Sequence, residues 1–595
     1  MDAGTHPIRV IFGQDRRHIV PLFQRRYVWK KESQWEPLWE DIRNVAVRLT
    51  DQVETRPHFL GAVVLDQLRK PTGSVETRLI IDGQQRLTTI QVLLEALCDL
   101  CATLGAEKYH KALLKLTRND DPMSDNADDR FKVWPTNRDQ EDFRRVMDAG
   151  SPADLLALYG VKDPTKGVGQ PIADAYLYFY EAVKDWVRPG ENGMEGRLEI
   201  LYQTLREKLR MVVIDLSTDD DAQLIFETLN ARGTPLLPSD LVKNFLFHRV
   251  ELAHEPLEPL YAQYWEQFDL ESAYWGEELG RGHARRARID LFLQHYLTVK
   301  TADEVPVGHL YSAYRQYAAG EGSPKVQLSS IHAYARVYQS FDNLAPDTRE
   351  GRFFSRLSAM DIGTALPFLL EVTIRLKDHK ALLTRVLEDV ESFLVRRMIV
   401  QLNTRGYNRL FIDLLQQLEG EVREAHARTR EFLLAGDNES NRWPKDDEFR
   451  AAWIEVAAYR VLVRQRVRMV LEAVEQQIRS EKSEKIELKE KLTIEHVLPQ
   501  QWRTHWPLPE GAGEDAAARR SHLIDTFGNL TLLTRKLNPS VSNGPWADKK
   551  KAIQKHSALA LNRDFPDEAA WDEGTILQRG RELFSHARKI WRHPG

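Results

Sequence analysis

Cysteine is almost absent from this chain, which limits its chemistry. Cys98 and Cys101 are the only two cysteines among 595 residues. A tetrahedral zinc site needs four ligands, and no second cysteine pair is present to complete one. The two cysteines lie three residues apart within a predicted helix, so we expect them to be buried as small apolar side chains. A chain with so few cysteines is typical of the reducing cytoplasm, so we predict a cytoplasmic location.

Long apolar runs are also missing. The chain has no stretch of about eighteen apolar residues, so we expect no membrane-spanning helix. The first residues, Met1 to His6, lack a basic region followed by an apolar core, and we therefore expect no secretory signal. A hydrophobic content of 42% and a charged content of 29% predict a soluble globular protein. The length of 595 residues predicts about three or four domains.

The chain also lacks an excess of positive charge. The net charge is −5, so the chain as a whole has no attraction for nucleic acid. Any DNA contact must come from local basic patches. The candidates are Arg464 and Arg468, in a stretch crowded with arginine, and Lys549 and Lys550 near the C-terminus. A solvated helix face is the alternative interpretation of the two arginines.

The sequence does contain a pattern suited to phosphodiester cleavage. Glu495 precedes His496, and Asn529 and Asn538 follow, nine residues apart. Cleavage needs a base that activates water and a divalent cation at the scissile phosphate. Histidine titrates near neutrality and suits the base, while Mg²⁺ prefers oxygen ligands such as Glu495 and an asparagine carbonyl. A Glu-His pair alone is more often an ion pair, and Gly-Asn alone a turn, so the prediction depends on their combination and order.

This segment resembles the HNH (His-Me finger, ββα-metal) nuclease domain at the C-terminus of GmrSD-type modification-dependent restriction proteins. The matching stretches are residues 495–499 (EHVLP) and 528–533 (GNLTLL), then Asn538, Trp546 and Lys549. The resemblance implies that His496 is the general base and that Asn529 braces the loop that aims it. Glu495 and Asn538 would bind Mg²⁺ or Mn²⁺. The chain departs from the family in having Asn538 where a histidine is usual, and in a long insert whose residues 510–515 we expect to form an exposed loop.

Short strands and helices alternate in the N-terminal region. Aliphatic and β-branched runs predict strands, and apolar residues at three- and four-residue steps predict helices. We expect strands at residues 8–12, 18–20, 58–65, 78–81 and 211–216, and helices at residues 36–49, 87–101 and 221–232.

The strand at residues 78–81 runs directly into residues 82–86 (DGQQR), at the start of the next helix. A glycine turn in this position exposes N–H groups to an anion, and the helix dipole favours phosphate there. Arg86 would add a bidentate phosphate contact, which explains a cation in a first helical turn. A capping box between Asp82 and Gln85 is the simpler interpretation, and the two can hold together.

The same region resembles the ParB-like N-terminal domain of the GmrSD family, which is associated with nucleotide binding and hydrolysis. The matching stretches are residues 23–29, 59–61, 81–89, 225–233 and 239–244. The resemblance implies a nucleoside triphosphate site that includes Gln24, Arg25, Asp82, Gly83, Gln84, Gln85, Arg86, Glu227, Asn230 and Lys243. Glu227 and Asn230 lie three residues apart and can converge on a metal or a ribose, or form a surface pair. No Walker A signature occurs, so a P-loop NTPase is excluded.

Helical periodicity dominates the middle of the chain. Residues 436–441 are polar and predict a linker or hinge, and a single long helix is expected at residues 446–489. We therefore expect four segments: a ParB-like domain (1–240), an α-helical spacer (241–435), a linker with the long helix (436–485) and the nuclease domain (486–595).

The sequence thus predicts a multidomain α+β protein that is predominantly helical. The two resemblances imply a nucleotide-regulated, Mg²⁺-dependent DNA endonuclease of a type IV restriction system, acting on modified double-stranded DNA. Two other functions stay open: a nucleotide-gated ParB-like DNA clamp with an inactive nuclease end, and an RNA-cutting toxin. A homodimer is one expected assembly.

Overall fold

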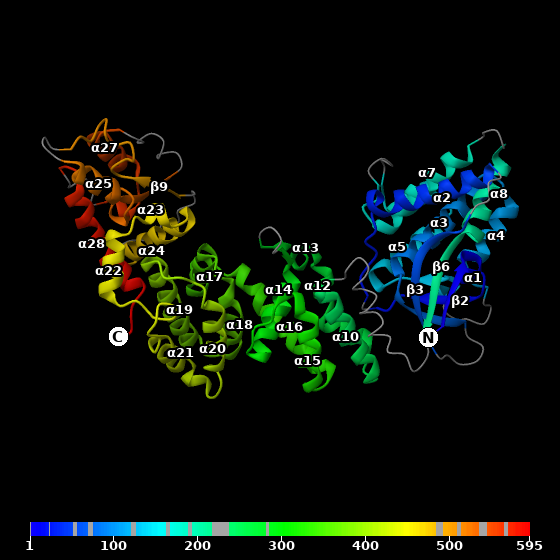
Figure 1. Cartoon of the computed structure of the whole chain (residues 1–595), viewed down its shortest axis with the longest axis horizontal. Coiled ribbons are helices and arrows are strands. Elements are labelled where there is room, and N and C mark those ends of the chain that lie inside the picture. The colour runs from blue at the N-terminus through cyan, green and yellow to red at the C-terminus, as the bar shows by residue number, and fades with distance from the viewer. Residues whose placement is uncertain are drawn as a thin grey trace. The chain divides into compact units, whose positions relative to one another are not determined.

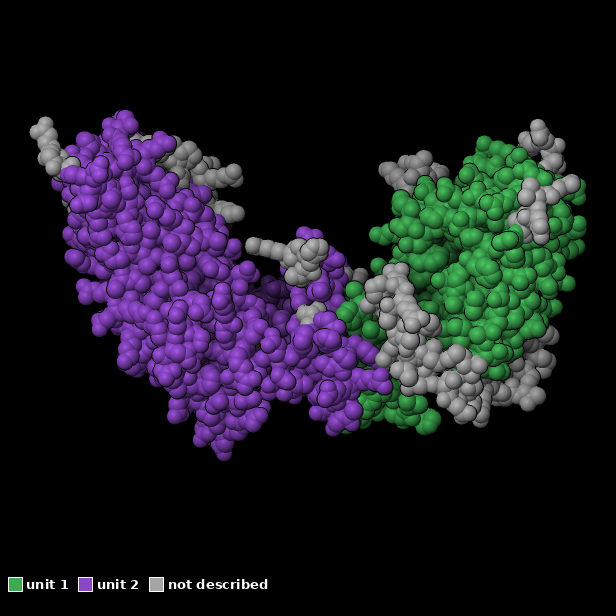
Figure 2. Space-filling view, in the orientation of Figure 1, with its two compact units in different colours: residues 1–270, 322–325 green, residues 271–321, 326–595 purple. Residues whose placement is uncertain are grey.

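The structure is a computed structural model, and it describes residues 2–22, 24–51, 56–68, 75–120, 127–161, 167–188, 193–216, 237–280, 285–482, 492–508, 513–534, 544–563 and 569–595. They fold into two compact units (Figure 2). Unit 1 comprises Met1–Leu270 and Gly322–Lys325, and unit 2 comprises Glu271–Glu321 and Val326–Gly595. No helix within the described ranges is long and apolar enough to cross a membrane.

A mixed six-stranded sheet organises unit 1, in the order β1-β6-β3-β4-β2-β5. The strands are β1 (Asp2–Pro7), β2 (Arg16–Ile19), β3 (His58–Leu68), β4 (Glu76–Asp82), β5 (Val133–Trp134) and β6 (Leu209–Leu216). Strand β3 is parallel to β6 and antiparallel to β4, while β2 is parallel to both β4 and β5. The strands predicted around residues 18–20, 58–65, 78–81 and 211–216 are confirmed.

The strand predicted at residues 8–12 is wrong, because these residues form helix α1 (Ile8–Phe12). Its buried residues are Ile8, Ile11 and Phe12. A run of aliphatic residues does not by itself separate a strand from a short buried helix. The edge strand of the sheet is formed by the preceding residues instead: Asp2–Pro7 pairs antiparallel with β6.

Helix α3 (Gln84–Thr103) lies in the core of unit 1, and every residue from Leu87 to Cys101 is buried. It packs against α4 (Glu107–Thr117) and α7 (Pro171–Val187) (Figure 1). The predicted helices at residues 36–49 and 87–101 are confirmed, as α2 (Glu36–Thr50) and α3. Both cysteines are free and buried, as predicted. The predicted helix at residues 221–232 lies outside the described residues.

The remaining helices of unit 1 surround this core or follow it along the chain. They are α5 (Asn137–Asp148), α6 (Pro152–Leu158), α8 (Gly193–Gln203), α10 (Pro238–Leu252), α11 (Leu257–Tyr264) and α12 (Glu266–Leu270).

Unit 2 is mainly helical. Its principal helices are α14 (Arg288–Thr301), α15 (Leu310–Gly320), α17 (Arg349–Met360), α18 (Leu366–Arg375), α19 (Lys380–Val400), α20 (Tyr407–Gln416) and α21 (Ala425–Leu434). Helix α16 (Pro324–Ser340) begins within the residues assigned to unit 1 and continues in unit 2. The prediction of a predominantly helical α+β chain is confirmed, while the finer assignments to ParB-like and ββα-metal folds stay predictions.

The expected linker at residues 436–441 is an internal turn of unit 2. The buried Arg397 guanidinium donates hydrogen bonds to the carbonyls of Glu439, Ser440 and Arg442. The single long helix predicted after this turn is also wrong. The chain forms α22 (Asp446–Glu455), α23 (Ala458–Val461) and α24 (Arg464–Lys482) instead.

A two-stranded antiparallel sheet follows, made of β9 (Leu492–His496) and β10 (Leu530–Thr534). Between the strands lies α25 (Glu514–Leu523), so part of the expected exposed loop at residues 510–515 is helical. Helices α27 (Trp546–His556) and α28 (Glu573–Ile590) come after the sheet. One continuous apolar core joins Leu492 and Leu530 of the sheet to helices α17 to α24 and to α28. Residues on both sides of the expected boundaries at 435 and 485 contribute to this core, and the boundaries themselves stay predictions.

Candidate functional site

His496, at the end of β9, has a carboxylate partner that the sequence did not indicate. Its Nε2 lies 3.0 Å from Oδ1 of Asp525, and both side chains are buried. Burial opposes ionisation of Asp525, yet the hydrogen bond and the positive charge of a protonated His496 hold the pKa of this carboxyl below its usual value. A buried carboxylate on one ring nitrogen fixes the tautomer and orientation of a histidine.

Three side chains complete the surroundings of this pair. Gln500 Nε2 donates to Asp525 Oδ1 at 3.3 Å, and Arg460 Nη2 donates to Oδ2 at 3.3 Å. The Tyr459 ring meets the His496 ring edge to face, with centroids 4.3 Å apart. The Tyr459 N–H also donates to the Asp525 carbonyl at 2.9 Å, so the start of α23 is fixed beside the histidine.

Asn529 holds the loop that follows His496. Its Oδ1 accepts from the Leu498 N–H at 2.8 Å and from Trp571 Nε1 at 3.0 Å. Its Nδ2 donates to the carbonyls of Leu498 and Ile524 at 2.8 and 2.9 Å. All four bonds involve a side chain with no exposed surface, so the contacts suit the bracing role that the resemblance implies.

Gly528 precedes this asparagine at a point of close backbone approach. A Cβ at Gly528 would lie 2.1 Å from the carbonyl oxygen of Ile576 on α28. Only glycine therefore allows the turn before β10 to pack this closely on the last helix.

Glu495 points away from His496, because successive side chains of a strand lie on opposite faces. Its Oε1 accepts a hydrogen bond of 2.7 Å from Lys549 Nζ on α27. Lys549 also donates to the carbonyls of His496 and Val497, at 2.7 and 3.2 Å. The predicted DNA contact by Lys549 is therefore wrong: the side chain has no exposed surface, and burial lowers the pKa of its ammonium group.

The other predicted DNA-contacting side chains lie nearer the surface. Arg464 is exposed, donates to the Tyr459 carbonyl, and has its guanidinium 3.3 Å from the centre of the Tyr459 ring. Arg468 is half-buried and lies 3.6 Å from the Glu472 carboxylate. Lys550 is half-buried on α27. Their roles on DNA stay predictions.

The donor set expected for a divalent cation is incomplete within the described residues. Glu495 is paired with Lys549 and lies on the strand face opposite His496, and Asn538 lies outside the described residues. No group of three or more His, Cys, Asp or Glu side chains in the described part of the chain is arranged to hold a metal. The described residues alone therefore do not fit a metal site.

In unit 1, residues 82–86 form the strand-turn-helix that the sequence predicts, with one difference. Gly83 is the residue before helix α3 and adopts a left-handed conformation with φ of 93°. No side chain caps the helix, so the capping box predicted between Asp82 and Gln85 is not formed. The start of α3 thus depends on a glycine, which adopts this conformation without strain.

The glutamines of this motif bind the segment around residues 24–28. Gln84 Nε2 donates to the Arg25 carbonyl at 3.0 Å. Gln85 donates to the Arg26 carbonyl at 3.0 Å and accepts from the Val28 N–H at 2.8 Å. Gln24 in turn donates to the Ile80 carbonyl at 2.7 Å. The structure brings the two matching stretches together, and these three glutamines have internal partners.

Arg86 is less exposed than a first-turn arginine would suggest. Its guanidinium donates to the Ala62 carbonyl and lies against Gly61, and burial lowers its pKa. Lys243, on α10, is buried and forms an ion pair of 2.7 Å with Asp269. Glu227 and Asn230 lie outside the described residues.

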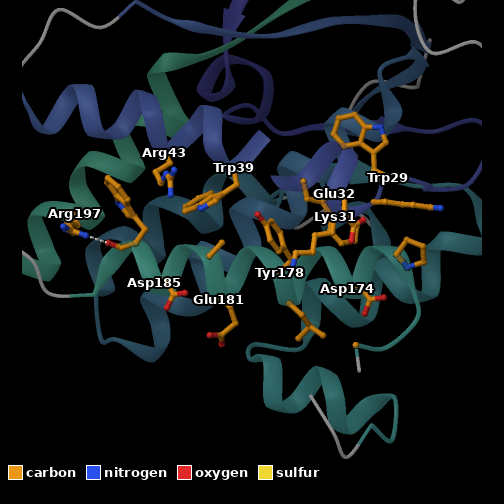
Figure 3. Close-up of a pocket in the computed structure, with 17 residues that line it drawn as sticks. Trp29, Lys31, Glu32, Trp39, Arg43, Asp174, Tyr178, Glu181, Asp185 and Arg197 are labelled. Atoms are coloured by element: carbon orange, nitrogen blue, oxygen red, sulfur yellow. Dashed lines mark hydrogen bonds between the residues drawn. The ribbon is translucent and has the colours of Figure 1, made fainter. Parts of the chain in front are cut away.

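A groove of about 1100 Å³ in unit 1 lies between α2 and α7 (Figure 3). Its aromatic lining includes Trp29, Trp35, Trp39, Tyr178 and Trp186. Trp35 Nε1 donates to the Tyr27 hydroxyl at 2.9 Å, and that hydroxyl lies 2.6 Å from Thr89 Oγ1 on α3. Four basic and four acidic side chains line it, so its lining carries no net charge and does not select phosphate.

Two family models match the chain. The one described as the N-terminal domain of the GmrSD restriction endonuclease matches residues 8–247. The one described as the C-terminal domain of GmrSD restriction endonucleases matches residues 443–586, which include β9, β10, Asp525 and most of α28. No curated protein matches the chain.

Proposed function

Because the chain belongs to the GmrSD family of type IV restriction endonucleases, we propose that it hydrolyses modified double-stranded DNA at His496 under nucleotide control. The observation that carries the proposal is the His496–Asp525 pair, 3.0 Å apart and buried within the family's C-terminal domain. The pair sits on a loop fixed by Asn529, so its geometry is set before a substrate arrives.

Asp525 determines which nitrogen of His496 acts. With Nε2–H donated to Asp525, the lone pair of Nδ1 takes a proton from water. The resulting hydroxide attacks phosphorus, and the P–O bond to the leaving oxygen breaks. That oxygen takes a proton from solvent water, and the imidazolium then returns its proton to the solvent. Asp525 stabilises the imidazolium during the step and keeps its own negative charge.

A divalent cation stays part of the proposal. We propose Mg²⁺ or Mn²⁺, with Asn538 as an expected ligand; Glu495 would join it only by leaving its ion pair with Lys549. The cation's chemistry would be to neutralise charge on the scissile phosphate. Chelation with excess EDTA tests this directly, because full cleavage in its presence would exclude a metal-dependent reaction.

The nucleotide site is proposed at residues 82–86. Two observations support it: the start of α3 has no side-chain cap, so its N–H groups face outward from the helix end, and Arg86 beside it is a desolvated cation. An anion would satisfy both.

Cleavage assays on the full chain test the proposal. Modified and unmodified phage DNA are incubated with Mg²⁺ or Mn²⁺, with and without each nucleoside triphosphate. His496→Ala should lower cleavage by about 10²- to 10⁴-fold while DNA binding stays unchanged. His505→Ala, at an exposed histidine of the same segment, is the matched control and should cut normally. Wild-type cleavage by His496→Ala would refute the site.

Asp525→Asn separates a positioning role from a purely structural one. It should lower cleavage by on the order of 10²- to 10⁴-fold, since the amide can hold the wrong tautomer. Asp525→Glu keeps a carboxylate for His496 and should restore part of this cleavage. Equal losses of cleavage in both variants, with a lower melting temperature, would show that Asp525 only stabilises the fold. Equal cleavage of RNA would favour the RNA-cutting alternative, and binding without cleavage by the wild-type chain would favour the clamp.

A further inference from the structure

The corner between α23 and α24 exposes two valines that are two residues apart in the sequence. Val461 ends α23 and is 49% exposed, and Val463 precedes α24 and is 59% exposed, whereas Leu462 between them is buried. The corner comprises residues 460–464. Removing branched aliphatic side chains from water is favourable, so two exposed close together favour a partner that covers them.

Two arginines flank the valines. The Arg460 side chain is 66% exposed and is anchored by its 3.3 Å ion pair with Asp525. Arg464 is exposed and is anchored on the Tyr459 ring and carbonyl. The corner therefore presents an apolar tip between two oriented positive charges. A partner with regularly spaced negative charges and an apolar surface between them matches this arrangement.

The corner also borders the proposed catalytic histidine. Tyr459, the residue before the corner, contacts the His496 ring, and its N–H is bonded to the Asp525 carbonyl. Arg460 bonds the same aspartate that orients His496. A phosphodiester placed at His496 would thus bring the neighbouring nucleotides onto the corner.

We propose that residues 460–464 form a wedge that contacts duplex DNA beside the scissile phosphate. Arg460 and Arg464 would bind phosphates, and Val461 and Val463 would press against a base step or the sugars in the groove. Apolar side chains used in this way unstack a base step and bend the duplex. The inference rests on the proposed function, because it takes DNA as the substrate of His496.

Binding measurements separate the two parts of the wedge. A fluorescent DNA duplex of about 30 base pairs, with cytosine or 5-hydroxymethylcytosine, is titrated by anisotropy across a salt series. The full chain carries His496→Ala, so that the probe is not cut. Val461→Ser with Val463→Ser should weaken binding by about tenfold, with an unchanged salt dependence, because no charge is removed. Arg464→Gln should instead reduce the slope of log K against log salt by about 0.9, the value for one phosphate contact.

Matched controls keep the test specific. Val47→Ser, at a valine 41% exposed on α2 of unit 1, should leave DNA binding unchanged. Both wedge valines are exposed, so the melting temperature of their variant should match that of the parent. In a set of duplexes with 2-aminopurine at successive positions, at least one should brighten on binding to the parent, from unstacking, and stay dim with the valine variant.

If the double valine variant binds DNA with wild-type affinity and brightens the probe normally, the proposal that these valines contact DNA is wrong. Tighter binding of duplex RNA, with the same loss in that variant, would overturn its assignment to DNA. If the wild-type chain cuts no DNA but the valine variant still binds tenfold more weakly, the nuclease proposal fails and the wedge stands as a DNA contact.

Discussion

Replacing Lys549 with methionine should destabilise the segment around β9 far more than a surface substitution would. Methionine keeps most of the side-chain length but removes the ammonium group. That group serves three acceptors, the Glu495 carboxylate and the carbonyls of His496 and Val497. Without it, a carboxylate whose side chain is only 12% exposed is left without its cation.

The expected magnitude follows from this loss. Breaking a buried ion pair by removing one partner costs about 3 to 5 kcal/mol. Glu495 keeps some contact with water, so the lower end, about 3 kcal/mol, is expected. Lys551→Met is the control: Lys551 is exposed on the same helix, and exposed substitutions change stability by about 0.5 kcal/mol or less. Adding Glu495→Gln to Lys549→Met should recover part of the lost stability, because the unpaired charge of the carboxylate is removed.

Hydrogen exchange read by mass spectrometry measures this effect locally. Peptides that contain β9 and β10 should exchange faster in Lys549→Met and at the parent rate in Lys551→Met. Unfolding of the whole chain is less direct, since two compact units need not unfold together. Unchanged protection in Lys549→Met, with a weaker salt dependence of DNA binding, would refute this reasoning and restore Lys549 as a phosphate contact.

Two further predictions concern unit 1. Burial, with the neighbouring Glu95 adding to it, raises the pKa of Asp99 to about 7, so stability should fall as pH rises from the ordinary carboxyl range through about 7. Asp99→Asn keeps an acceptor for the Tyr176 hydroxyl and should flatten that fall, giving a higher melting temperature than the wild type at pH 8; equal pH profiles would contradict it. Arg86→Ala should abolish binding of nucleoside triphosphates in calorimetry and cost about 1 to 3 kcal/mol of stability through the lost bond to Ala62. Unchanged nucleotide binding in a folded Arg86→Ala protein would remove residues 82–86 from the proposed site.

Local patterns in the amino-acid sequence determine much of the fold of unit 1. The strand at residues 78–81, the glycine turn and the buried helix that follows can all be predicted, because periodicity and a glycine act within a few residues. The same holds for the helix at residues 36–49. The order of the Glu-His, Gly-Asn and Asn motifs also indicates the family, which the matches to residues 8–247 and 443–586 confirm.

Only the tertiary structure determined which side chains meet. Asp525 lies 29 residues from its partner His496, and no local pattern marks it. Lys549 lies 54 residues from Glu495. Its charge suggested a contact with DNA, whereas in the fold it is buried and pairs with this carboxylate. Glu495 and His496 are neighbours in the sequence, yet the pleat of β9 turns them to opposite faces. Sequence patterns carry periodicity and motif order, whereas burial and pairing depend on how distant segments pack, and at this site packing decides the chemistry.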